Sequence, residues 1–134
     1  MDSLSKKLTV YKGEIYTQMC LKAENGYYTA YIRGKRCKTE NEFFNEVSAS
    51  FQFPYYFGEN WAAMDECLCD LEWLSVTKVF VVIDDFSCMF SEQEHIQNIL
   101  QNRVIKYFGI MTEYWIEQGV SVEVWLNNWV AGFI

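Results

Sequence analysis

Apolar and polar residues alternate over residues 15–22, in the first third of the chain, and a second run that looks like β-structure, YYTAYI, follows at 27–32. Such alternation is typical of β-strands with one buried face. Asn25 and Gly26 lie between the two runs, and both residue types tolerate the positive φ of a two-residue hairpin turn. The pattern predicts an N-terminal β-hairpin, followed by a turn at 33–36.

The rest of the chain switches between helical and strand periodicity. In chain order the predicted elements are a helix at 39–52, a helix at 60–72, a strand at 78–86, a helical stretch at 91–118 and a strand at 120–126. The long stretch is either one helix or two with a break near Asn102 or Gly109. Strands separated by helices predict a parallel sheet with right-handed crossovers.

Several residues indicate where these helices begin and end. Thr39 or Asn41 can cap the helix at 39–52, and Pro54 closes it. Ser91 and Glu94 have the Ser-x-x-Glu spacing of a capping box. We therefore expect the long helical stretch to begin at Ser91.

Length and composition place the chain among single-domain globular proteins. It has 134 residues, of which 51% are hydrophobic. Its longest apolar run, at 79–83, is far too short to cross a bilayer, and no secretion signal is recognisable at 1–10. The five cysteines form no Cys-x-x-Cys pair, which favours reduced thiols and a cytoplasmic location.

Charge is distributed unevenly along the chain. Residues 1–39 hold eight Lys/Arg and three Asp/Glu, a net +5, whereas residues 40–134 hold three and fifteen, a net −12. An acidic surface repels nucleic-acid phosphates, so direct nucleic-acid binding is not expected. The acidity either steers a basic partner or only keeps the protein soluble, and composition favours neither.

The segment 53–74 carries five carboxylates and no Lys or Arg. At about 100° per residue, its helix has one broad apolar face and one outer face. The residues of the outer face, called here the acidic ridge, are Ala62, Asp65, Glu66, Cys69 and Asp70. Glu59 falls just before the helix near the same side.

Three aromatic residues, Tyr55, Tyr56 and Phe57, precede this helix. Helix and sheet can cover only one side of so short a loop, so we expect some of these rings at the surface. Phe57 is predicted to fill the core, while Tyr55 and Tyr56 could do either. Exposed aromatics beside charged residues are typical of protein-binding hot spots.

Signatures of catalysis are weak. The chain has no phosphate-binding glycine loop and no zinc or nucleophile motif. Asp84 and Asp85 follow a predicted buried strand, where carboxylates can hold Mg²⁺. An alternative hypothesis is therefore a metal-dependent hydrolase that uses Glu59, Asp65, Asp84 and Asp85.

The segment FPYYFGENWAAMDECLCDLEWL resembles the signature of barstar-like proteins, the inhibitors of barnase-type bacterial ribonucleases. The matching positions are Pro54, Tyr56, Gly58, Glu59, Asn60, Ala63, Cys67 and Leu68, and Asp70, Leu71, Trp73 and Leu74 fit a longer form of the motif. The resemblance implies an α/β fold with a barstar-like three-stranded parallel sheet packed by helices, extended here by the N-terminal β-hairpin. It divides a single domain, 1–134, into a β extension at 1–26, a barstar-like core at 27–126 and a tail at 127–134.

The resemblance also implies a function. The family's loop and helix insert into a ribonuclease active site, where carboxylates occupy the places of substrate phosphates. This implies a cytoplasmic bacterial inhibitor or immunity protein of the toxin–antitoxin kind, with no enzymatic activity, no cofactor and no membrane association. Its partner would be a basic, extracellular-type ribonuclease or nuclease toxin. The predicted partner-binding residues are Tyr55, Tyr56, Gly58, Glu59, Ala62, Asp65, Glu66, Cys69 and Asp70.

The chain departs from the family's pattern at three ridge positions. Ala62 stands where the family usually has Asp, Glu66 replaces the family's main Asp, and Asp65 stands where the prototype has Trp. We therefore expect a partner other than barnase itself. A further alternative is an interaction module that keeps the fold but no longer binds a nuclease.

Overall fold

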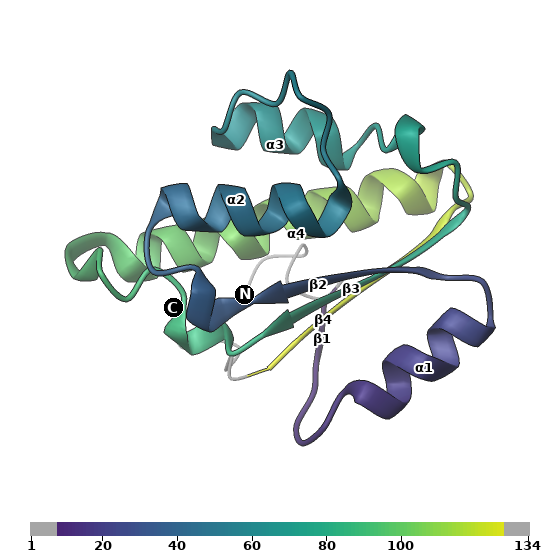
Figure 1. Ribbon diagram of the computed structural model, residues 1–134, viewed down its shortest axis with the longest axis horizontal. Coiled ribbons are helices and arrows are strands. Elements are labelled where there is room, and N and C mark those ends of the chain that lie inside the picture. The colour runs from purple at the N-terminus through teal and green to yellow at the C-terminus, as the bar shows by residue number, and fades with distance from the viewer. Residues whose placement is uncertain (1–7, 128–134) are drawn as a thin grey trace.

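Four parallel strands form one sheet in the order β1–β4–β3–β2 (Figure 1). The computed structural model describes residues 8–127 of the chain. Its strands are β1 (Leu8–Val10), β2 (Tyr28–Arg33), β3 (Lys78–Asp84) and β4 (Ser121–Leu126), and its helices are α1 (Tyr16–Glu24), α2 (Glu40–Phe51), α3 (Trp61–Leu68) and α4 (Gln97–Glu117). The predicted parallel α/β architecture is confirmed, with four strands rather than three.

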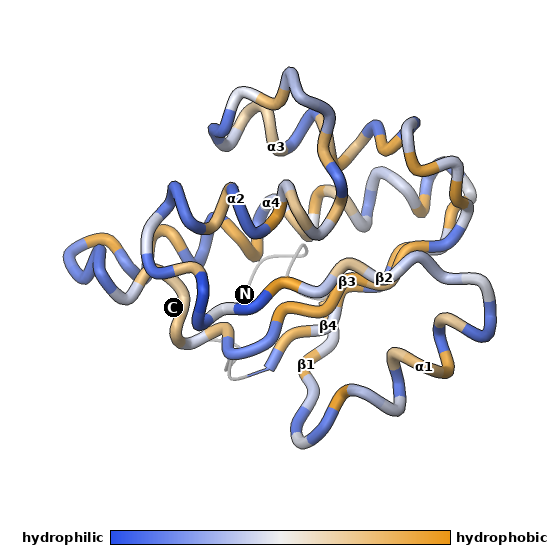
Figure 2. Tube along the Cα trace, viewed as in Figure 1, coloured by the Kyte–Doolittle hydropathy of each residue, from blue (hydrophilic) through white to orange (hydrophobic). Residues whose placement is uncertain are grey.

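The helices cover the two faces of the sheet unequally. Figure 1 shows α2, α3 and α4 on one side and α1 alone on the other. Strand β3 lies between β4 and β2, and Val79, Val81 and Ile83 face the main core, while Phe80 and Val82 face α1. Both faces of β3 are therefore buried, which explains its continuous apolar sequence, visible in Figure 2.

The predicted N-terminal hairpin is wrong. Residues 16–24 form a helix that connects β1 to β2 at the opposite edge of the sheet. Ile15 and Met19 are one helical turn apart and pack together against the second face of the sheet. Gly26, with φ of 84°, ends the helix, and its N–H donates to the Ala23 carbonyl over 3.1 Å. A glycine with positive φ occurs at helix C-termini as readily as in hairpin turns. The Asn25–Gly26 pair therefore could not distinguish a helix end from a hairpin.

The ends of α2 follow the sequence prediction. Thr39 is its N-cap, and the side-chain oxygen accepts a hydrogen bond from the Glu42 N–H over 3.2 Å. The helix ends at Phe51, and Gln52 adopts a left-handed conformation with φ of 55°. This reversal sends the chain away from the sheet into the loop before α3.

The predicted limits of the other two helices need correction. Helix α3 ends at Leu68 instead of near residue 72, because Leu71 has a φ of 51° and a separate 3₁₀ turn follows at Glu72–Leu74. Helix α4 is unbroken over 21 residues and begins at Gln97 after a 3₁₀ turn at Glu94–Ile96, without a side-chain cap. Ser91 and Glu94 therefore form no capping box. Over the described residues, no helix is both long and apolar enough to cross a membrane.

Candidate protein-binding site

The loop between α2 and α3 is held from inside by two phenylalanines. The ring centroids of Phe53 and Phe57 are 4.8 Å apart in an edge-on arrangement, and Phe57 also packs against Phe44. With these two rings turned inward, the tyrosines between them point outward: Tyr55 is 100% exposed and Tyr56 is 64% exposed. Phe57 packs against the main core as expected, and both tyrosines, which the sequence left open, lie at the surface.

Asn60 fixes the junction between the loop and α3. Its side-chain oxygen accepts a hydrogen bond from the Ala63 N–H over 2.8 Å, and its amide donates to the Gly58 carbonyl over 3.1 Å. A Cβ at Gly58 would lie 3.2 Å from that amide nitrogen, closer than an ordinary contact. Gly58 therefore lets the loop close tightly over the helix N-terminus, with Glu59 exposed beside it.

The inner face of α3 anchors the helix to the domain. Met64 and Leu68 are fully buried, and the Trp61 ring stacks on Phe43 with centroids 5.2 Å apart. The Trp61 indole N–H donates to Glu40 of α2 over 2.8 Å. At the other end of the helix, the Trp115 indole N–H of α4 donates to the Leu68 carbonyl over 2.8 Å, satisfying one of the free C-terminal carbonyls.

The acidic ridge lies only partly on a helix: Ala62, Asp65 and Glu66 belong to α3 as predicted, whereas Cys69 is its C-cap and Asp70 follows it. Ala62, Glu66 and Asp70 are exposed, whereas Asp65 and Cys69 are half-buried. Burial, and then the charge of Glu66, raises the pKa of Asp65. Burial, followed by the Asp65 charge, raises the pKa of the Cys69 thiol to about 11, so this thiol stays protonated near neutral pH.

A shallow cavity of about 110 Å³ lies between the loop and the ridge. Its lining consists of Tyr56, Phe57, Ala63, Glu66, Cys67 and Asp70. Loss of water contact, and then the charge of Asp70, raises the pKa of the Tyr56 phenol, so the ring presents a neutral hydroxyl. The binding prediction omitted Ala63 and Cys67, although with Glu66 and Asp70 they follow the i, i+3, i+4, i+7 spacing of one helical stripe.

Two cations of α4 border the ridge, Arg103 near Trp61 and Lys106 near Asp65. The Arg103 guanidinium lies 5.9 Å from the Trp61 ring centroid, and Lys106 lies close enough to Asp65 to oppose the upward shift of its pKa. Within residues 8–127 neither cation forms an ion pair with a carboxylate. Sequence reasoning missed them, because only the packing of α4 against α3 brings them to the ridge.

The carboxylates of the metal-hydrolase hypothesis do not come together. Asp84 accepts hydrogen bonds from the hydroxyls of Tyr11 and Tyr31 and from the side-chain amide of Asn127. Glu59 and Asp65, by contrast, belong to the loop and helix above α2. Among the residues that the structure describes, no three His, Cys, Asp or Glu side chains are grouped to hold a metal ion. The geometry gives that hypothesis no support.

Comparison with known proteins agrees with the fold and the motif. The family described as Barstar (barnase inhibitor) matches residues 27–127, about three quarters of the chain. A search of curated proteins gives no match. The family match spans β2 to β4, including the loop, α3 and the acidic ridge, and leaves β1 and α1 outside it. The chain belongs to the barstar family of barnase inhibitors.

Proposed function

We propose that the protein is a cytoplasmic immunity protein that binds a basic bacterial ribonuclease or nuclease toxin and covers its active site. The contact surface consists of the exposed loop at 55–58 and the acidic ridge. No chemistry is required of the protein, because inhibition follows from occupying the site where RNA would bind.

One observation carries this proposal: the exposed carboxylates of α3 and its flanks have no basic residue among them in sequence. Over residues 53–74 five acids occur without a Lys or Arg. Of these, Glu59, Glu66, Asp70 and Glu72 are exposed in the structure. A ribonuclease must present cations to RNA phosphates, and carboxylates at matching positions can take their place. Opposite charge also accelerates encounter, an effect for which the barnase–barstar pair is itself the standard example.

The cavity beside Tyr56 suggests how a basic side chain of the enzyme is held. Glu66 and Asp70 lie along one edge, and Tyr56 offers a neutral hydroxyl and an aromatic face. A cationic side chain entering there would exchange water for two carboxylates and a ring. Tyr55, fully exposed at the tip of the loop, would add apolar contact area.

Two features distinguish this surface from a uniformly acidic one. Ala62 leaves an uncharged position in the first turn of α3, and Arg103 and Lys106 stand near Trp61 and Asp65 of the same helix. These features favour a partner whose charge pattern differs from that of barnase. They also support the alternative of an interaction module without nuclease binding, so the test must separate the two.

The test is inhibition and association with a panel of purified basic ribonucleases, barnase included. We expect Glu66→Lys to slow association with a bound enzyme by about tenfold at low salt, and to lose most of this effect above about 0.3 M salt. Glu24→Lys is the matched control, because it makes the same charge change on α1, on the other side of the sheet. Equal effects of the two variants would refute the site, and no inhibition of any enzyme in the panel would favour the interaction module.

A further inference from the structure

A second cavity lies beyond the C-terminal end of α3, on the other side of Asp70 from the cavity beside Tyr56. Its volume is about 220 Å³. Its lining consists of Asp70, Leu71, Glu72, Ser75, Val76, Val79, Trp115 and Val120. Asp70 lines both cavities, so the second cavity continues the surface of the acidic ridge.

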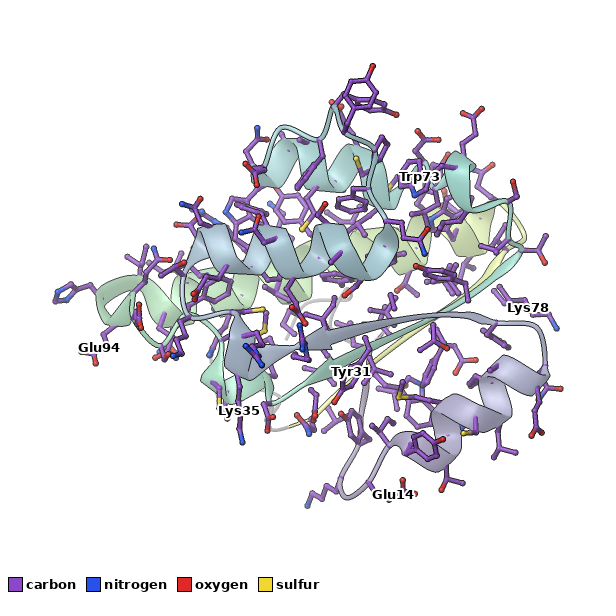
Figure 3. All side chains as sticks on the ribbon, viewed as in Figure 1. Glu14, Tyr31, Lys35, Trp73, Lys78 and Glu94 are labelled. Atoms are coloured by element: carbon purple, nitrogen blue, oxygen red, sulfur yellow. The ribbon has the colours of Figure 1, made fainter. Side chains whose placement is uncertain are left out.

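The walls of this cavity are held in place by the fold. Leu71 and Val79 are buried in the main core, and Val76 packs against it. Trp115 is fixed by its hydrogen bond to the Leu68 carbonyl and by an edge-on contact with Tyr114, at 5.0 Å between ring centroids. The neighbouring turn is held by Trp73, labelled in Figure 3, whose indole N–H donates to the Phe51 carbonyl over 2.9 Å.

The chemistry of the lining is divided between an apolar interior and an acidic rim. Asp70 and Glu72 are both exposed at the rim, and within the described residues neither forms an ion pair. Among residues 8–127, no Lys or Arg lines the cavity. An occupant that matches this division has an apolar stem, a cationic end and a flat surface for the indole.

We propose that this cavity binds an arginine side chain. The guanidinium is planar, so it can stack on Trp115 while donating to the carboxylates of Asp70 and Glu72. The methylene stem would lie against Val76 and Val120. This inference rests on the proposed function, because the arginine would belong to the same basic partner. It would lie next to the basic side chain that the partner places in the cavity beside Tyr56.

The cavity can be tested without the partner, by NMR titration of the full-length protein with N-acetyl-arginine amide. The indole N–H resonance of Trp115 is the reporter. We expect a saturable shift with a dissociation constant on the order of millimolar, as suits a fragment. N-acetyl-citrulline amide is the matched probe, because it has nearly the same shape without the charge, and it should bind at least about tenfold more weakly.

Two substitutions assign the shift to this cavity. Glu72→Gln should weaken the arginine probe about threefold to tenfold, because it removes one charge from the rim without changing its shape. Val76→Phe should abolish the shift by filling the interior. A Trp115 resonance that does not respond, or that responds equally to both probes, would overturn the proposal, as would an undiminished response of the folded Val76→Phe variant.

Glu66→Gln separates this inference from the proposed function. It should weaken ribonuclease binding while leaving the arginine titration unchanged, since Glu66 does not line the second cavity. A normal titration in a protein that binds no ribonuclease would refute the function and keep the cavity. Ribonuclease binding without any titration would refute the cavity alone.

Discussion

Asp84 joins all four strands at the carboxyl edge of the sheet, and its removal should destabilise the fold. Tyr11 follows β1, and its hydroxyl donates to the Asp84 carboxylate over 3.0 Å. The hydroxyl of Tyr31, in β2, donates to the same carboxylate over 2.7 Å. The side-chain amide of Asn127, just after β4, also donates to it. Figure 3 shows Tyr31, one of these donors, on the α1 side of the sheet. The perturbation to make is Asp84→Asn, with Asp84→Ala as the more severe form.

The magnitude follows from the three side-chain donors. A hydrogen bond to a charged acceptor contributes about 1.5–3 kcal/mol, but the bonds of one cluster are not additive, and water can replace part of them because Asp84 is only half-buried. We expect Asp84→Ala to lower the free energy of unfolding by about 3 kcal/mol and Asp84→Asn by about 2 kcal/mol. For a domain of this length, 2 kcal/mol corresponds to a fall in Tm of roughly 8 °C.

The dependence on pH gives the reasoning a second test. Burial raises the pKa of Asp84, but the hydrogen bonds from Tyr31 and Tyr11 outweigh it, and the net pKa is lowered. The charge therefore stabilises the fold above the unfolded pKa of about 3.9 and loses this effect as the pH falls through the lower folded value. Burial, and then Asp84, raises the pKa of Tyr31 to about 12, so its contribution is complete below about pH 10 and is lost as the pH rises toward 12.

Urea unfolding followed by tryptophan fluorescence measures these differences. The gap between wild type and Asp84→Asn should be widest near neutral pH and should narrow below about pH 4. A gap under about 1 kcal/mol at neutral pH, or one that is unchanged at low pH, would refute the hydrogen-bond account. An increase in Tm with Mg²⁺ that Asp84→Asn abolishes would revive the metal hypothesis instead.

Two further substitutions test other parts of the fold. Gly34→Ala should lower the free energy of unfolding, measured with heat or urea, by at least about 2 kcal/mol, because the added Cβ would overlap the backbone oxygens of Asp84 and Asp85. A neutral result would mean that the turn after β2 can move. Glu46, only 9% exposed, accepts three hydrogen bonds from Arg33. Burial raises the pKa of Glu46, but the hydrogen bonds from Arg33 lower it overall, so its contribution should disappear below about pH 4. Glu46→Gln should lower the free energy of unfolding by about 1–2 kcal/mol near neutral pH and by nothing measurable at low pH. An equal loss of stability at both pH values would contradict the charge-based explanation.

Local sequence patterns predicted the central elements well but not the N-terminal segment. The predicted strand at 78–86, which ends at Asp84, and the predicted helix at 39–52 were correct in type and place, because burial on one or both faces leaves a direct periodicity. The N-terminal helix depends on contacts distant in sequence. Lys22 forms an ion pair with Glu123 at 2.6 Å and lies 5.5 Å from the Phe80 ring. These contacts cover the second face of the sheet and favour a helix over a strand here. A local sequence pattern does not contain them.

The candidate site was likewise predictable from local sequence patterns only in part. The direction of the acidic ridge could be predicted, because it follows from the periodicity of one helix, whereas the sequence left open whether Tyr55 and Tyr56 are buried or exposed. Arg103 and Lys106 could not be predicted, because they come from about forty residues away in the sequence and reach the ridge only through packing of α4 on α3. The second cavity also depends on α4, through Trp115.

These contacts divide the surface of α3 into two ends with different chemistry. Beside Trp61 and Asp65 the ridge has uncharged Ala62, the carboxylates of Glu59 and Asp65 and the cations of α4, whereas toward Asp70 it has the carboxylates of Glu66 and Asp70 and both cavities. A basic partner would be attracted more strongly by the second end, because at the first end the cations of α4 offset part of the acidic charge. The proposed interface is therefore centred on Asp70, away from the Trp61 ring and the guanidinium of Arg103 beside it. The uncharged Ala62 and the cations of α4 thus act in the same direction, which is why we expect the partner's cations to cluster around Asp70.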